Sequence, residues 1–342
     1  MKKRYFGTIL AVMAVCALLL SSCGGAWVHQ GMGWQDEDSA PFSIVTTMFA
    51  PFDFVREIAT EQWSVTMLIP PGAESHSFEP TPQDLIRIKN CDIFIYVGGE
   101  SDTWLTELLK TIDNQQMHVI RMMDLVDSLY TEAHEQGHGH EHAHEYDQDH
   151  DHDHEFLTGV ASGTHFHEQD EHVWTTPVNA MKISQGIADV MAAINPEGAE
   201  NYQENVDRYH DELHKLDAAF RQVVAESKRQ FLVFGDRFPF RYFVEEYGLE
   251  YLAAFSGCTV DTNPSAATLA FLIEEMRARE IPVVLTVELS NQQIAHIIQE
   301  EIGAKVMEFH AAHNITAIDF YNNVSYVDIM YRNVEVLRMA LN

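Results

Sequence analysis

The sequence is short of cysteine and of basic residues. Only 4 of its 342 residues are cysteine, and 21 Lys and Arg stand against 52 Asp and Glu, which gives a formal net charge of −31. The shortage of basic residues argues against nucleic-acid binding, because phosphate contacts need clustered Lys and Arg. The cysteines lack the paired spacing of a zinc finger, so a thiolate metal site is not expected.

Histidine, by contrast, is abundant. The chain has 19 His, and His is the commonest metal-ligating side chain. Hydrophobic residues make up 46% of the sequence, enough for a sizeable core, and the length favours two lobes over one. The acidity raises the local concentration of cations around the protein. The composition therefore favours a globular protein that binds a cation.

Residues 1–22 have the pattern of an export signal. Three basic residues open the chain, and the apolar run 9–20 that follows is short for a membrane span. The small residues before Cys23 resemble a bacterial lipobox, which implies cleavage before Cys23 and lipid on its sulfur. Cys16 is the other option, and an ordinary signal peptide is the alternative. Residues 23–40 are expected to form a flexible tether.

Two cysteines remain after the signal, Cys91 and Cys258. An exported protein permits a disulfide, but two distant cysteines cannot be paired from sequence alone. We expect both to be small buried residues, with a disulfide as the alternative.

Strand-like apolar runs alternate with helical segments in two regions of the chain. This alternation predicts an α/β fold with two similar lobes, each a mainly parallel sheet with flanking helices. The N-terminal lobe is expected to span residues 41–194 and the C-terminal lobe residues 230–342. The expected strands are 44–48, 65–69, 92–97 and 118–122 in the first lobe and 231–234, 283–287 and 306–309 in the second.

A long helix is expected between the lobes, over residues 195–229. Its apolar positions follow a heptad-like 4, 3, 4, 3 spacing: Tyr202, Val206, Tyr209, Leu213, Leu216, Phe220 and Val223. About 30 residues at 1.5 Å each give a helix of roughly 45 Å. Such a helix suits a linker between two lobes, and a free coiled-coil dimer is the alternative.

A histidine-rich segment, about residues 131–168, interrupts the first lobe. It has almost no apolar residues, so we expect it to be disordered and hypothesise that it binds several metal ions weakly. Its histidines are His134, His138, His140, His142, His144, His150, His152 and His154.

Three other histidines lie where an α/β fold places its ligand site. His76 follows a predicted strand, His172 precedes a predicted helix, and His310 comes directly after the strand 306–309. In open α/β sheets, ligands bind outside the carboxyl ends of the strands. This placement predicts a shared metal site, although sequence alone does not show that the three side chains converge.

Two motifs carry a family resemblance. Pro71-Gly72-Ala73-Glu74-Ser75-His76-Ser77-Phe78-Glu79-Pro80, Asp170-Glu171-His172-Val173-Trp174 and the long helix resemble the metal-binding lipoproteins of zinc and manganese ABC importers. The resemblance implies two α/β lobes joined by a rigid helix, with the metal in the cleft between them. It also implies a non-enzymatic, monomeric protein, held outside the membrane by a lipid anchor alone and partnered by a permease. His76 and His172 match the first-lobe ligands.

The second lobe departs from the family pattern. The position of the third ligand, normally His or Glu, falls on Arg237, which has no lone pair to offer. We expect Asp236 to replace it, with Gly235 easing a close backbone approach. The fourth position, normally Asp, falls on His310. His313 and Glu288 are weaker candidates.

Three His and one carboxylate suit Zn²⁺, whereas Mn²⁺ prefers more oxygen ligands. The resemblance therefore predicts a zinc-capture protein for an importer, with a manganese-binding homologue or a metal-dependent surface adhesin as alternatives. A zinc hydrolase is a remote alternative, because the sequence has neither a His-Glu-x-x-His helix nor a Gly-x-Ser-x-Gly elbow.

Overall fold

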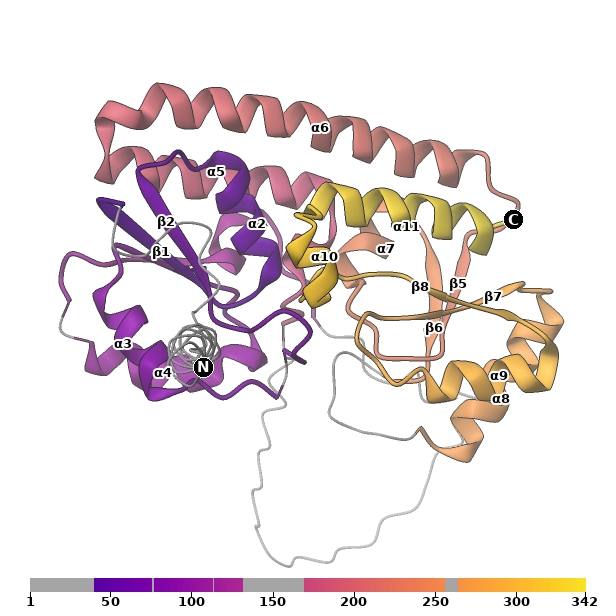
Figure 1. The fold of residues 1–342 in the computed structure, drawn as a ribbon. Helices are drawn as coiled ribbons and strands as arrows, with labels where there is room; N and C mark the ends of the chain where they lie inside the picture. The colour runs from indigo at the N-terminus through magenta and orange to yellow at the C-terminus, as the bar shows by residue number, and fades with distance from the viewer. Residues whose placement is uncertain (1–39, 76, 113, 132–168, 256–263) are drawn as a thin grey trace, which may run out of the picture. The chain divides into compact units, whose positions relative to one another are not determined.

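The computed structural model describes residues 40–75, 77–112, 114–131, 169–255 and 264–342. These residues belong to one compact unit, Gly33–Asn342 (Figure 1). Several predicted features lie outside the described residues. They are the signal segment with Cys16 and Cys23, the tether up to residue 39, His76, the histidine-rich segment from residue 132 and Cys258.

The first half of the unit is built on a four-stranded parallel sheet. Its strands are β1 (Phe42–Thr46), β2 (Trp63–Met67), β3 (Ile93–Tyr96) and β4 (His118–Arg121), in the order β2-β1-β3-β4. Its helices are α2 (Phe49–Ile58), α3 (Pro82–Asn90), α4 (Thr103–Thr111) and α5 (Pro177–Ile194). All five residues of β2 are buried, as expected for a parallel strand whose sheet is covered on both faces.

The second half repeats this sheet. Its strands are β5 (Phe231–Phe234), β6 (Glu250–Ala253), β7 (Val283–Thr286) and β8 (Lys305–Glu308), all parallel, in the order β6-β5-β7-β8. Its helices are α7 (Arg241–Tyr247), α8 (Ala266–Ala278), α9 (Gln293–Ile302), α10 (Ala317–Tyr321) and α11 (Tyr326–Ala340). The predicted fold class is confirmed. Sequence analysis missed the edge strand β6, which is short and has no fully buried residue.

The predicted long helix is α6 (Ala199–Ala225), with 27 residues. All seven positions of its apolar seam are buried. It packs against α2 and α5 of the first half and α11 of the second, and Figure 1 shows α5 and α11 along its length. Because the chain itself covers this seam, the seam is not exposed for a coiled-coil dimer.

Hydrogen bonds join the two halves near α11. The Trp174 indole donates to the Ala311 carbonyl at 2.7 Å, and the Tyr326 hydroxyl donates to the Trp174 carbonyl at 2.7 Å. The Tyr326 backbone N–H donates to the buried Asp53 carboxylate at 2.7 Å. The segment around Trp174 is therefore held against the chain that follows β8.

Cys91 is a buried free thiol, as predicted. Burial raises the pKa of this thiol to about 12, which makes it unreactive at neutral pH. Within the described ranges, no helix combines the length and the apolar character needed to cross a membrane.

Candidate metal centre

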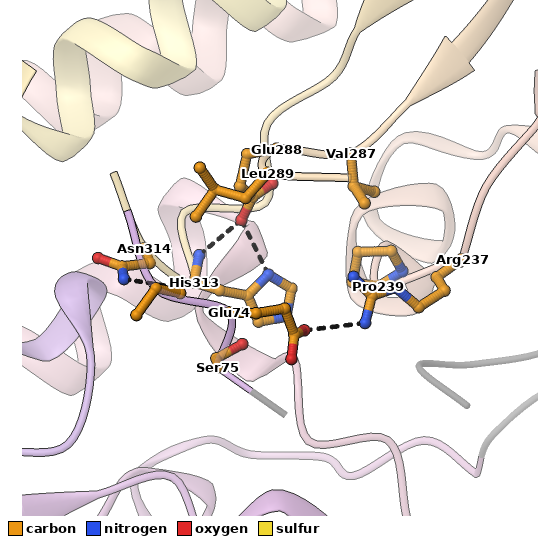
Figure 2. Close-up of a pocket in the computed structure, with 10 residues that line it drawn as sticks. Glu74, Ser75, Arg237, Pro239, Val287, Glu288, Leu289, His313 and Asn314 are labelled. Atoms are coloured by element: carbon orange, nitrogen blue, oxygen red, sulfur yellow. Dashed lines mark hydrogen bonds and ion pairs between the residues drawn. The ribbon is translucent and has the colours of Figure 1, made fainter. Parts of the chain in front are cut away.

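A pocket lies where loops from both halves meet (Figure 2). The loop after β2, the loops after β5 and β7, and the segment after β8 all contribute to it. Its lining residues are Ala73, Glu74, Ser75, Arg237, Pro239, Val287, Glu288, Leu289, His313 and Asn314. The carboxyl ends of parallel strands therefore frame the pocket, as expected for an α/β ligand site.

His172 lies just before α5 and is fully buried. Its Nδ1 is 2.9 Å from Asp170 Oδ1, and the same oxygen accepts the His172 backbone N–H at 2.9 Å. An ionised carboxylate can only accept hydrogen bonds, so this contact places the ring proton on Nδ1. The lone pair then lies on Nε2, the arrangement that metal-ligating histidines use.

His313 has the same arrangement in the second half. Its Nδ1 is 2.9 Å from Glu288 Oε1, which also accepts the His313 backbone N–H at 2.9 Å (Figure 2). The other carboxylate oxygen accepts the Ala311 N–H at 2.7 Å. Burial alone would raise the pKa of Glu288, but His310, His313 and the Ala311 N–H together hold this pKa well below its usual range. Glu288 is therefore ionised and orients His313.

The rings of His172 and His313 are in contact. Their centroids are 5.0 Å apart with an interplanar angle of 80°. Trp174 packs against both rings, at centroid distances of 5.4 Å and 5.3 Å. The structure thus brings together one histidine from each half, each with a carboxylate on Nδ1.

His310 is held differently. Its Nδ1 accepts the Ala312 N–H at 2.9 Å, so the proton of the neutral ring lies on Nε2. The Asn333 side chain bonds both its backbone N–H and its carbonyl, each at 2.8 Å. Among the described residues that line the pocket, His313 is present and His310 is not.

Asp236 bonds the loop after β5 to the loop after β7. Its Oδ1 accepts the Arg237 N–H at 2.9 Å and its Oδ2 accepts the Val287 N–H at 3.2 Å, while the Ser290 side chain also bonds it. Burial raises the pKa of this carboxyl, and these hydrogen bonds oppose the rise. Asp236 is not among the described residues that line the pocket, so its role as a ligand stays a prediction.

Gly235 has a packing role that the sequence did not reveal. A Cβ at this position would come within 2.8 Å of the Ala295 Cα in α9. A side chain here would therefore push α9 away from the end of β5. The glycine is required by this close helix–strand contact.

Sequence analysis also missed acidic residues around the site. Glu74 lies two positions before His76, and its Oε1 accepts a bond from Arg237 Nη1 at 3.0 Å. Glu171 lines a neighbouring pocket together with Ser75 and His313. Both lie inside the quoted motifs, where the histidines were the stronger signal. No group of three or more His, Cys, Asp or Glu fit to hold a metal occurs within the described residues, which leave out His76.

The chain is similar to proteins of zinc uptake. It is 29% identical over 331 residues to the zinc-binding lipoprotein AdcA of Streptococcus pneumoniae, a match covering 97% of this chain and 60% of AdcA. It is also 29% identical over 342 residues to the high-affinity zinc uptake system protein ZnuA of Bacillus subtilis, covering 100% of this chain and 99% of that protein. The chain thus spans less than two thirds of AdcA but nearly all of the Bacillus protein.

A solved structure agrees with these relationships. The Zn(II)-bound ZnuA-like domain of Streptococcus pneumoniae AdcA matches with a TM-score of 0.67 and 26% identity, covering 88% of this chain and 98% of that domain. A family model described as zinc-uptake complex component A, periplasmic, matches residues 44–340, which include the pocket and both sheets except the first two residues of β1. Members of this family are components of zinc-uptake complexes and are not enzymes. The chain belongs to the ZnuA family of periplasmic zinc-uptake components.

Proposed function

We propose that this protein captures Zn²⁺ outside the cytoplasmic membrane and delivers it to the permease of an ABC importer. The observation that carries the proposal is the contact between His172 and His313, each with a carboxylate on Nδ1. Such carboxylate–histidine pairs fix the ring and its tautomer and make the other nitrogen a better ligand. Family membership and the zinc-binding relatives support zinc as the cargo.

The proposed ligands are His172 and His313 through Nε2, together with His76 from the sequence motif. We favour His313 over His310 because the His313 ring contacts that of His172 and has its Nδ1 on a carboxylate. An imidazole-rich set suits Zn²⁺, which binds nitrogen at about 2.0–2.1 Å, better than it suits Mn²⁺. Asp236 remains a candidate for the fourth position. Asp236→Ala should lower zinc affinity at least 10-fold if the carboxylate binds the metal.

Zinc titration of the full chain tests this proposal. Native mass spectrometry should show one Zn²⁺ that survives a competing chelator, beside weaker ions lost on deletion of residues 133–154. His172→Ala should abolish the chelator-resistant ion. A wild-type chain without a chelator-resistant ion, or a deletion variant without one, would contradict the proposal.

We further propose that lipid on Cys23 anchors the exported protein to the outer face of the membrane. A diacyl anchor supplies two chains, which are enough for stable attachment where a single chain is marginal. Cys23→Ala should leave zinc binding intact and move the protein from the membrane fraction to the soluble fraction. Unchanged membrane partitioning of this variant would contradict the anchor.

A further inference from the structure

An ion pair links the two halves at the edge of the metal pocket. Arg237 Nη1, from the loop after β5, donates to Glu74 Oε1, from the loop after β2, at 3.0 Å (Figure 2). The two side chains are only 19% and 34% exposed. Partial burial reduces screening by water and salt, so this pair should be worth more than an exposed one.

Hydrogen bonds to Asp236 hold the backbone of Arg237 against the loop after β7 in the second half. Asp236 accepts the Arg237 N–H and, with its other oxygen, the Val287 N–H of the loop after β7. The next residue in that loop is Glu288, which orients His313. The backbone that presents the guanidinium is therefore bonded to the loop that orients the second-half histidine.

In the first half, a hydrogen bond within the loop after β2 holds the Glu74 side chain. Its Oε2 accepts the Ser77 N–H at 2.9 Å, so one carboxylate bonds both its own loop and Arg237. The same loop has a second attachment, because Asn314 Nδ2 donates to the carbonyls of Pro70 at 2.7 Å and Ala73 at 2.8 Å. Two side chains of the second half therefore hold the loop after β2.

We propose that Arg237 is a positioning residue that clamps the loop after β2 against the second half and so slows the release of bound Zn²⁺. The inference rests on the proposed function. A guanidinium has no lone pair for a metal and stays charged at any physiological pH, so it serves as a permanent cationic partner for Glu74. On this proposal, zinc leaves when the loops around the pocket separate, and separation requires the Arg237–Glu74 ion pair to break.

The pair also balances charge beside a site for a cation. Removing the Glu74 charge adds one net positive charge beside the pocket, which should slow the arrival of Zn²⁺. Removing the Arg237 charge adds one net negative charge beside the pocket, which should speed the arrival of Zn²⁺. Loss of either partner should speed release. Opposite effects on arrival with the same effect on release distinguish a clamp from general loss of structure.

The test measures zinc association and dissociation rates in the full chain by stopped flow with a chromophoric chelator. Arg237→Gln and Glu74→Gln should each raise the dissociation rate about 10-fold, as expected for a partly buried pair. The charge swap Arg237→Glu with Glu74→Arg should restore the rate to within about threefold of wild type. Arg332→Gln is the matched control, because Arg332 pairs with Asp319 at 3.3 Å within the second half, and it should release zinc at the wild-type rate.

Arg237→Lys keeps the charge and should give an intermediate release rate, which provides a test if the uncharged variants fold poorly. Wild-type dissociation rates in both single variants, or a charge swap no better than the single variants, would overturn the clamp. A wild-type chain without chelator-resistant zinc would instead overturn the proposed function.

Discussion

His172 and His313, whose rings are in contact, are each oriented by a carboxylate on Nδ1, but the two pairs are built in different ways. In the first half, Asp170 and His172 are two residues apart, and one carboxylate oxygen accepts both the backbone N–H and Nδ1 of the histidine. In the second half, Glu288 and His313 are 25 residues apart and come from the ends of neighbouring strands β7 and β8. The Asp170–His172 pair forms within a short local segment, whereas the Glu288–His313 pair forms only when β7 and β8 lie side by side in the sheet.

This difference shows which parts of a metal site a sequence reveals. The local pair, Asp170 and His172, lies within the five-residue motif 170–174, so His172 could be identified from that motif. The remote pair exists only once β7 and β8 lie side by side, and nothing in the segment after β8 distinguishes His313 from His310. Substitutions in each pair should show whether the two contribute differently to zinc binding and to stability.

The largest effect is expected from removing His313, the proposed ligand of the second half. His313→Ala should lower zinc affinity by more than about 100-fold, because a ligand should matter more than the residue that orients it. His310→Ala should lower affinity less than His313→Ala does, because His310 lies beside Glu288, at 3.6 Å between Nδ1 and Oε2, and its Nδ1 accepts the Ala312 N–H. Competition titration with a chelator measures both. If His310→Ala lowered zinc affinity as much as His313→Ala does, His310 would also be a zinc ligand.

The orienting carboxylates should have the next largest effect. Asp170→Asn and Glu288→Gln should each lower zinc affinity about 10–100-fold. Glu288→Gln should also destabilise the metal-free protein, since Glu288 accepts two backbone N–H groups besides the ring, at positions 311 and 313. Each charged bond is worth about 1.5–3 kcal/mol.

Urea unfolding of both metal-free variants measures this difference, with Glu250→Gln as control because Glu250 is exposed at the start of β6. Equal stability losses for Asp170→Asn and Glu288→Gln would show that the remote pair contributes no more to the fold than the local one.

A smaller effect is expected where one side chain serves both histidines. Trp174 packs on both rings and donates to the Ala311 carbonyl. Trp174→Phe keeps an aromatic ring but leaves that buried carbonyl without its donor, at a cost of about 1–3 kcal/mol. Thermal unfolding should show this loss, and zinc affinity should fall by less than about tenfold. Trp104→Phe is the control and should bind zinc like the wild type, because Trp104 lines the neighbouring pocket and is not among the described residues that line the pocket of Figure 2.

The smallest effect concerns a buried carboxyl of the first half whose pKa shifts in the direction opposite to that of Glu288. Burial raises the pKa of Asp102 from 3.8 to about 6, although the Val97 and Gly98 N–H groups oppose the rise. Between these values the native state binds the extra proton, so the free energy of unfolding should fall as pH rises from about 4 to 6. Asp102→Asn should make this slope less steep in urea unfolding of the metal-free protein, while other buried carboxyls such as Asp53, whose pKa is raised to about 7, keep contributing to it. An unchanged slope would contradict the assignment.

Much of the fold could be predicted because its signals are local. The apolar periodicity of α6 and the buried strand β3 are readable over short windows. The edge strand β6 was missed because short, partly exposed strands give little pattern. At the site, residue type alone shows that Arg237 cannot bind a metal, but its partner Glu74 is 163 residues away, and only the fold brings them together.

The remote pair has one more consequence, which concerns backbone strain. Leu289, next to Glu288, and Ala312, next to His313, have positive φ values of 57° and 61°. A left-handed conformation costs residues with a Cβ roughly 1–2 kcal/mol, and such strain tends to gather at functional sites. Glycine at either position would relieve it in the folded state. Glycine substitution at Leu289 or Ala312 would therefore stabilise the folded backbone directly beside the proposed metal centre, where greater backbone freedom would also loosen the proposed ligand His313.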